Sequence, residues 1–297
     1  MEKIATLKSS ELSENQFLFK INLSFIEKGW LGIDPRNVVT DTYKSSSGHI
    51  FSSIVHFNST QFIERIIFLI DDKAPMKEIY IFLETFFGGK RELSFSGYGI
   101  EINLQSRFAD YVAGYFGRKT DYNYDEDPSK WHHDMFVSPA SAPGEITVPQ
   151  GYVLGPLQQC HVELIAQQWA RDVGLEHVDL NDPNFGWIRS LVLANITDRP
   201  CSGIFTDESS GTVPIAWLSI YGGGSIGQLH VLEEHRRKGL ARVLIRHTLK
   251  TIQETHGIDC RLHACVSKGN TVSSNLLLSE GWELQPQNYK RKLFPIA

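Results

Sequence analysis

The stretch LHVLEEHRRKGLARVLIRHTL, residues 229–249, begins like a buried strand and ends like an amphipathic helix. Five of the six residues that join these two parts, residues 233–238, carry a formal charge. A helix that begins near Gly239 leaves its first amide N–H groups unpaired and presents the positive end of its dipole at this junction. The junction therefore predicts a binding site for an anion.

Cationic side chains lie around this predicted anion site in the sequence. They are Arg236, Arg237, Lys238 and Arg242. Guanidinium groups form paired hydrogen bonds with phosphate oxygens, and glycine lets a ligand approach the backbone closely. We therefore expect the junction to hold a doubly charged group such as a pyrophosphate.

The residues around the glycine narrow the choice of phosphate ligand. A P-loop needs G-x4-G-K-[ST], and a dinucleotide-binding helix opens with G-x-G-x-x-G; neither string occurs at this junction. The junction instead reads R-x-x-G-x-A from Arg236 to Ala241, five residues after Val231 of the expected strand.

Length and composition limit the class of protein to which this chain can belong. The chain has 297 residues, which predicts two domains, and its 41% hydrophobic and 21% charged residues are typical of a soluble globular protein. A net charge of -5 argues against a dedicated nucleic-acid binder. No apolar run reaches the roughly 18 to 20 residues of a membrane span, and the N-terminal residues lack a signal or transit pattern. We expect a cytoplasmic chain with neither a nucleic-acid nor a membrane partner, and the sequence leaves the mitochondrion open.

The four cysteines are too few and too scattered for a disulfide scaffold. They are Cys160, Cys201, Cys260 and Cys265. We interpret them as reduced thiols of the core. The string CRLHAC brings Cys260, His263 and Cys265 close in sequence, but the second ligand pair of a zinc site is absent, so we expect no metal.

A break in composition divides the chain. Residues 137–151 gather prolines and glycines without hydrophobic periodicity. We therefore expect an N-terminal α+β domain over residues 1–142 and a second domain over residues 143–297. In the first half, the spacing of apolar residues predicts helices over 59–72 and 77–89, and WHHDMF at 131–136 is interpreted as a polar loop.

The second half has a clearer order of elements. Helical periodicity and turn signals predict an α+β or α/β sheet with helices against its faces, including two hairpins. The expected helices are 159–170, 185–195, 239–257 and 270–281. The expected strands are 151–157, 201–207, 212–221, 225–233, 260–268 and a strand-like end at 282–294.

A second motif follows the junction by about thirty residues. In NTVSSNLLLSEGW an asparagine begins a helix and a glycine and an aromatic residue close it; the motif positions are Asn270, Ser273, Leu276, Gly281 and Trp282. In this order the two motifs resemble the GCN5-related N-acetyltransferase (GNAT) superfamily. Residues 150–295 are most similar to the glycine N-acyltransferases of its FR47-like branch. The resemblance implies a mixed, mostly antiparallel central sheet flanked by helices, and residues 54–70 carry a weaker likeness that allows a degenerate GNAT-like domain in the first half.

The resemblance also implies an activity, which is direct transfer of an acyl group, acetyl by preference, from acyl-CoA to a small-molecule amine or amino acid. Backbone groups near His230 and Val231 would pair with pantetheine, and amides around Gly239 would hold the pyrophosphate. The residues expected at the cofactor are Val231, Arg236, Arg237, Lys238, Gly239, Leu240, Ala241, Arg242, Asn270 and Ser273.

The chain departs from the family pattern at two catalytic positions. Leu277 stands where many members carry a tyrosine that serves the departing thiolate, and Ser225 stands where a glycine N-acyltransferase would carry a carboxylate base. His230 is the candidate base, because it lies in the expected acyl-lining strand and an imidazole side chain suits proton transfer near neutral pH. The alternative is a hydrogen-bonded strand histidine without a catalytic role.

Three functions remain open at this stage. The first is an N-acyltransferase of small amines, and the second is a protein N-acetyltransferase, which needs an acceptor groove that admits an extended chain. The third is a non-catalytic member that binds CoA or only a partner, and the residues at 225 and 277 favour it.

Overall fold

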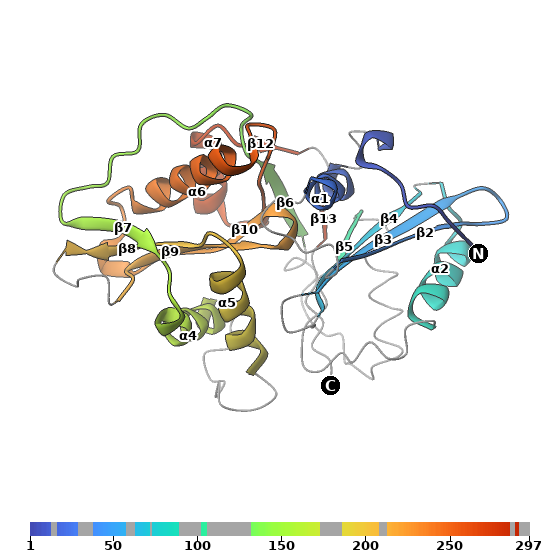
Figure 1. Cartoon of the computed structure of the whole chain (residues 1–297), viewed down its shortest axis with the longest axis horizontal. Coiled ribbons are helices and arrows are strands. Elements are labelled where there is room, and N and C mark those ends of the chain that lie inside the picture. Colours follow the sequence, from blue (N-terminus) through green and yellow to red (C-terminus); the bar gives the residue numbers. More distant parts are fainter. Residues whose placement is uncertain are drawn as a thin grey trace.

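The computed structural model describes residues 1–12, 17–28, 38–57, 63–71, 73–88, 102–105, 132–172, 186–207, 213–285 and 289–290. These residues form one thirteen-stranded sheet that runs through both halves of the chain, with helices on its faces (Figure 1). The sheet is mostly antiparallel, and only the pairs β4–β5 and β10–β11 among the described strands are parallel. The predicted fold class is confirmed.

The elements of the first half precede the proline-rich break. They are β1 Glu2–Ile4, α1 Phe17–Glu27, β2 Val38–Lys44, β3 Ile50–Phe57, β4 Ile63–Ile70, α2 Met76–Gly88, β5 Ile102–Gln105 and β6 His132–Val137, with a short 3-10 turn at Ser9–Glu11. Helix α2 ends at a glycine, as its sequence predicts.

The elements of the second half follow the order expected from the sequence. They are β7 Tyr152–Pro156, α4 Val162–Asp172, α5 Gly186–Asp198, β8 Ser202–Thr206, β9 Ala216–Tyr221, β10 Ser225–Val231, α6 Leu240–His256, β11 His263–Ser267, α7 Thr271–Ser279, β12 Glu283–Leu284 and β13 Tyr289–Lys290. Both predicted hairpins, β8–β9 and β9–β10, are present.

The two halves repeat one strand order. In the second half, β8, β9 and β10 pair antiparallel, α6 follows, and β11 pairs parallel to β10. In the first half, β2, β3 and β4 pair antiparallel, α2 follows, and β5 pairs parallel to β4. The opening strands β1 and β7 pair with β2 and β8 in the same way.

The last strand of each half, β6 in the first and β13 in the second, lies in the centre of the sheet. Strand β6 pairs with β11 and β12 of the second half, and β13 pairs with both β5 and β6. The break then crosses the α6 side of the sheet, visible as the long green connection in Figure 1. The division at residue 142 stays a prediction, and β6, which precedes it, is bonded to strands that follow it.

The apolar core lies on two sides of the second half. One cluster packs α6 against alternate residues of β9, including Ala216, Leu218 and Ile220, and extends into the first half through Phe19, Leu23 and Phe25 of α1. The other cluster packs α4 and α5 against the opposite face, where Trp217 lies. No helix in the described part of the chain combines the length and the apolarity needed to cross a membrane.

Two predictions for the first half are wrong. Residues 63–70 form strand β4 and not a helix, and Ile66 to Ile70 are all buried. A strand covered on both faces is a continuous apolar run, and such a run satisfies the helical spacing as well as the strand spacing. The string at 131–136 contains strand β6 and not a loop; His133 is buried, and its Nε2 lies 3.2 Å from the Ser267 hydroxyl of β11.

Candidate active site

Helix α6 begins at an open left-handed glycine. Gly239 is the N-cap with φ +80°, it is exposed, and a Cβ added to it would meet no atom within 4 Å. The first helical hydrogen bond to its carbonyl comes from the N–H of Val243 at 3.1 Å. The N–H groups of Leu240, Ala241 and Arg242 precede that bond, so they are the amides that a helix start offers to an anion.

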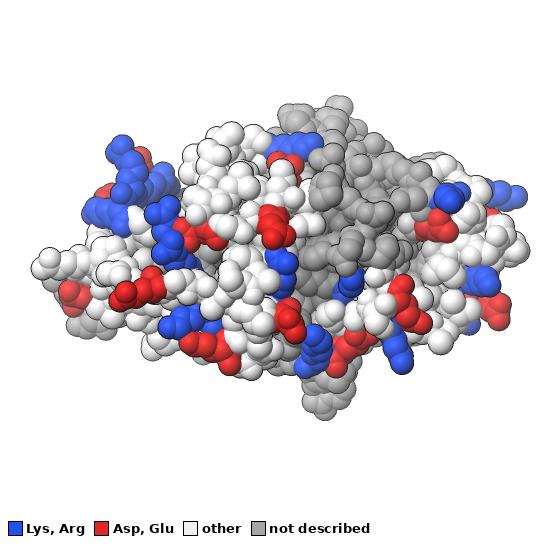
Figure 2. Space-filling view, turned by 90° about the horizontal axis from the view of Figure 1, so that it is seen from above, with Lys and Arg blue, Asp and Glu red and all other residues white. Residues whose placement is uncertain are grey.

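The basic residues before Gly239 differ in their surroundings. Arg236 folds back, and its Nε donates to the Val231 carbonyl at 3.0 Å. Lys238 donates to the Tyr152 hydroxyl at 2.9 Å. Arg237 is exposed, with a left-handed φ of +61°. Figure 2 shows basic side chains gathered at the end of the molecule that carries β7 and β8 in Figure 1.

Arg242 forms an ion pair on the side of α6 that faces α7. Its Nε lies 2.5 Å from Oε1 of Glu280, a side chain only 4% exposed. Arg246 bonds the other oxygen of the same carboxylate at 2.5 Å, and this hydrogen bond raises the pKa of Arg246 above its usual value. The structure therefore gives Arg242 a role in joining α6 to the end of α7, and its contact with a phosphate stays a prediction.

Strands β10 and β11 separate next to this helix start. In the described residues they pair at two positions, Ser225 with His263 and Ile226 with Ala264. A bulge then interrupts β10 between Gly227 and His230, where Gln228 takes φ +50°. Bulges re-aim a strand, and this one lies where β10 leaves its parallel partner.

The backbone of Val231 faces this widening edge. The N–H of Leu232 donates to the Ile215 carbonyl at 2.9 Å, on the β9 side. Neighbouring residues of a strand direct their amide groups to opposite edges, so the groups of Val231 point toward the β11 edge. The Val231 backbone, which is predicted to pair with pantetheine, therefore lies at the edge where β10 and β11 separate. In the chain, only the short turn between β10 and α6 lies between it and the helix start.

His230 lies on the opposite face of the sheet, where it is held from two sides. Its ring stacks on Trp217 with a centroid distance of 4.9 Å and an interplanar angle of 21°. Its Nδ1 lies 3.0 Å from Oδ2 of Asp172 at the end of α4. Gln168, one turn earlier in α4, donates to the other carboxylate oxygen at 3.0 Å.

The pKa of Asp172 reflects this setting. Burial raises the pKa of the carboxyl, but the hydrogen bonds from His230 and Gln168 and the charges of His230 and Arg236 outweigh it, so the pKa lies below its usual value. Asp172 is therefore ionised near neutral pH. Sequence reasoning missed this residue, because a carboxylate 58 positions before His230 gives no local signal.

Comparison with known proteins agrees with the second half of the fold. Residues 202–291 match the model of the FR47-like protein family, which spans β8 to β13 and includes the junction at Gly239. We call residues 202–291 the FR47-like domain, after this match. No match was found among the curated protein sequences.

Solved structures resemble the chain over most of its length. A protein of Drosophila covers 99% of both chains at 17% identity with a TM-score of 0.65, so the two-part fold around the FR47-like domain occurs elsewhere. A tandem GNAT protein from the clavulanic acid biosynthesis pathway covers 98% of both chains at 12% identity, with a TM-score of 0.46. A GCN5-related N-acetyltransferase from Kribbella flavida matches 83% of this chain and 87% of its own at 14% identity, with a TM-score of 0.47.

The remaining predicted positions of the FR47-like domain are placed as follows. Asn270 is the N-cap of α7, and its Oδ1 accepts the N–H of Ser273 at 3.1 Å. This confirms that the asparagine begins the helix. Ser225 and Leu277 are both 3% exposed, and neither side chain carries an acid or base at the position where the family pattern places one.

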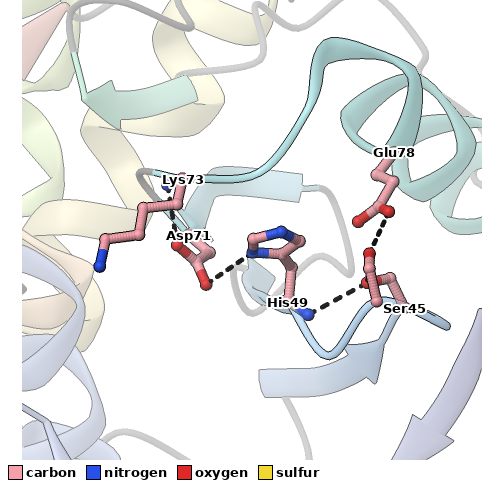
Figure 3. A network of polar contacts seen from close by, with 6 residues as sticks. Ser45, His49, Asp71, Lys73 and Glu78 are labelled. Carbon is pink, nitrogen blue, oxygen red and sulfur yellow. Dashed lines mark hydrogen bonds and ion pairs between the residues drawn. The ribbon is translucent and has the colours of Figure 1, made fainter.

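Outside the FR47-like domain, the equivalent junction of the first half differs chemically. Between β4 and α2 the chain reads Asp-Asp-Lys-Ala-Pro at residues 71–75, without a glycine. Asp71 accepts the N–H of Lys73 at 2.9 Å and lies 3.0 Å from Nδ1 of His49, and Glu78 in the first turn of α2 accepts the Ser47 hydroxyl (Figure 3). A carboxylate at a helix N-terminus already complements its dipole, so this junction disfavours an anion.

Metal ligation finds no support in the part of the chain that the structure describes. No group of three or more histidine, cysteine, aspartate or glutamate side chains is close enough there to hold an ion. Cys260 is buried, and burial raises the pKa of its thiol to about 12, so it is a thiol of the core and not a thiolate ligand.

Proposed function

We propose that the chain is an acyl-CoA-dependent N-acyltransferase that moves an acyl group, acetyl by preference, directly to an amine. One observation carries the proposal: the open start of α6 at Gly239 adjoins the edge at which β10 leaves β11. An anion site beside a strand edge whose backbone groups face away from β9 suits a cofactor that joins a pyrophosphate to an amide-containing chain. The FR47-like match of the same residues supports this choice.

The cofactor contacts are assigned from the positions of these groups. The amides of Leu240, Ala241 and Arg242 and the exposed side chain of Arg237 would hold the pyrophosphate, and Val231 would pair with pantetheine. Lys238 lies in the same loop, directly before Gly239, and its ammonium group donates to the Tyr152 hydroxyl. Arg236 would act through the Val231 carbonyl that it fixes, and Asn270 with Ser273 would contact the cofactor from the start of α7.

The chemistry needs one proton acceptor and no covalent enzyme intermediate. An amine loses a proton to the base, its lone pair forms a C–N bond with the thioester carbonyl, and the C–S bond breaks to release the CoA thiolate. The thiolate then takes a proton, so that amide and free thiol are the products. With Ser225 and Leu277 unable to serve, His230 is the proposed base, and its conjugate acid is the source of the thiol proton.

The acceptor is proposed to be a small amine or amino acid, as in the glycine N-acyltransferases. A protein N-terminus or lysine is the alternative acceptor, and turnover of peptides in place of free amino acids would select it. The non-catalytic alternative rests on one observation, the buried Ser225 and Leu277. We further propose residues 143–297 as the catalytic domain, residues 1–142 as its support and the cytoplasm as its compartment.

Thiol release tests this proposal directly. Purified chain is mixed with acetyl-CoA and a panel of free amino acids, primary alkylamines and short peptides, and free CoA is measured with a thiol reagent. Release that depends on one class of amine supports N-acylation and names the acceptor class. Acetyl-CoA binding without amine-dependent release would instead establish the non-catalytic alternative.

A further inference from the structure

The His230 ring is oriented by groups from two other elements. Asp172 of α4 bonds Nδ1 at 3.0 Å, and the indole of Trp217 of β9 covers one ring face at 4.9 Å. The His230 side chain is 10% exposed, so it is largely withdrawn from solvent. Both carboxylate oxygens of Asp172 are used, one by His230 and one by Gln168. The ring is thus fixed against rotation about its side-chain bonds.

The chemistry of the partners decides where the ring proton lies. An ionised carboxylate can only accept hydrogen bonds, so the short contact requires Nδ1 of His230 to carry the proton. In a neutral imidazole the other nitrogen, Nε2, then keeps its lone pair. Among the described residues, no side chain or backbone group bonds Nε2.

We propose that Asp172 is a positioning residue of the active site, which holds His230 in the tautomer whose Nε2 accepts the proton of the acceptor amine. This rests on the proposed function for the identity of the reaction, and on the geometry alone for the tautomer. When the amine nitrogen attacks the acyl-CoA carbonyl, its proton moves to Nε2 and the imidazolium stays paired with the carboxylate. The same proton goes to the CoA sulfur after the C–S bond breaks, which restores the neutral ring.

Charges around the pair favour this cycle. The groups that face it in the described part of the chain are the carboxylate of Asp172, the amide of Gln168, the indole of Trp217 and, at longer range, the guanidinium of Arg236. The carboxylate stabilises the imidazolium that forms during transfer. Gln168 and Arg236 keep that carboxylate ionised, so it remains an acceptor throughout.

The test compares Asp172→Asn with a matched control. Asparagine keeps the size of the side chain but can turn its amide toward Nδ1 and favour the other tautomer. The control is Glu163→Gln, on the same helix, because Glu163 is also a half-exposed carboxylate in an ion pair, with Arg189 at 2.6 Å. The readouts are acetyl-CoA affinity by calorimetry, amine-dependent thiol release as a function of pH, and the ring tautomer of His230 by nitrogen NMR.

We expect Asp172→Asn to lower kcat about 10- to 100-fold, which is less than the roughly 10²- to 10⁴-fold that a general base contributes because His230 itself is retained, and to leave acetyl-CoA affinity unchanged. Glu163→Gln should change none of these. Wild-type kcat in Asp172→Asn would overturn the proposal.

The NMR measurement keeps the outcome decisive if no amine is turned over. The wild-type ring should carry its proton on Nδ1, and Asp172→Asn should shift the population toward protonated Nε2. If this tautomer change is seen but no amine is turned over, the proposed acyl transfer is wrong and the positioning role of Asp172 is retained. A wild-type ring protonated on Nε2, or a tautomer that does not respond to Asp172→Asn, would refute the positioning role whatever the activity.

Discussion

Replacing Gly224 with alanine should destabilise the contact between the first half and the turn that precedes β10. Helix α1 packs on the turn Gly222–Gly224, and the side chains of Asn22 and Phe25 are fully buried there. A Cβ on Gly224 would lie 2.7 Å from both Cε atoms of the Phe25 ring. Gly224 also has φ +77°, which side chains with a Cβ seldom adopt.

The magnitude follows from two costs. A non-glycine residue in the left-handed region costs about 1 kcal/mol, and forcing a methyl group into a packed core costs about 1–3 kcal/mol. Gly224→Ala should therefore lower the free energy of unfolding by about 2–4 kcal/mol. For a chain of this size, Tm should fall by roughly 4–8 °C in a thermal unfolding scan.

Gly151→Ala is the matched control for this prediction. Gly151 has φ +83°, but a Cβ there meets no atom within 4 Å, so only the backbone cost of about 1 kcal/mol applies. In a Phe25→Ala background the extra cost of Gly224→Ala should shrink to that of the control, since the obstructing ring is gone. Equal stabilities of Gly224→Ala and Gly151→Ala in the wild-type background would refute the packing argument.

Three further predictions concern single sites. Gly239→Glu should abolish acetyl-CoA binding, because it places an anion at the proposed pyrophosphate site, whereas Gly257→Glu, at another open glycine of positive φ but different ψ at the other end of α6, should leave the affinity measured by calorimetry intact. Burial raises the pKa of the Cys260 thiol to about 12, so a thiol reagent at pH 8 should modify the exposed Cys160 and spare Cys260 until the chain unfolds, as mass spectrometry of digested peptides would show. Burial raises the pKa of Asp71, but hydrogen bonds from the Lys73 N–H and His49 lower it more, so its stabilising effect is present above the unfolded pKa of about 3.9 and is lost as pH falls through the lower folded pKa. The destabilisation that Asp71→Asn causes in urea unfolding should therefore be largest near pH 7 and should shrink steadily as the pH is lowered into the acidic range.

The sequence predicted the second half of the fold well because its signals are local. Helix α6 alternates apolar and polar residues at helical spacing, α7 begins at the capping side chain of Asn270, and the hairpins are marked by short polar turns. These features depend on residues a few positions apart. Strand β4 was predicted wrongly for the converse reason, since neighbours in the sheet and not its own periodicity decide the conformation of a fully buried run.

Contacts between segments far apart in the chain give no local signal in a single sequence. The glycines at 222–224 required no more than a turn in sequence, yet the structure seats Asn22 and Phe25 of α1 against them. The pairing of β6 with β11 and of β13 with β5 joins segments more than 120 residues apart. Asp172 could be recognised only once α4 was placed beside β10. The anion site was found early because its amides, glycine and cations lie within one turn of chain.

A calorimetric titration of the intact chain with acetyl-CoA tests the central claim most directly. The chain has one proposed cofactor site, at Gly239, because the carboxylates of Asp71 and Glu78 occupy the equivalent junction of the first half. We therefore expect one acetyl-CoA to bind per chain with a Kd on the order of 1 μM, a binding free energy of about -8 kcal/mol. The same titration with dephospho-CoA would isolate the contribution of the basic cluster. Absence of binding heat at high acetyl-CoA concentration, with no protection of the chain against thermal unfolding, would contradict the assignment of this junction as a cofactor site.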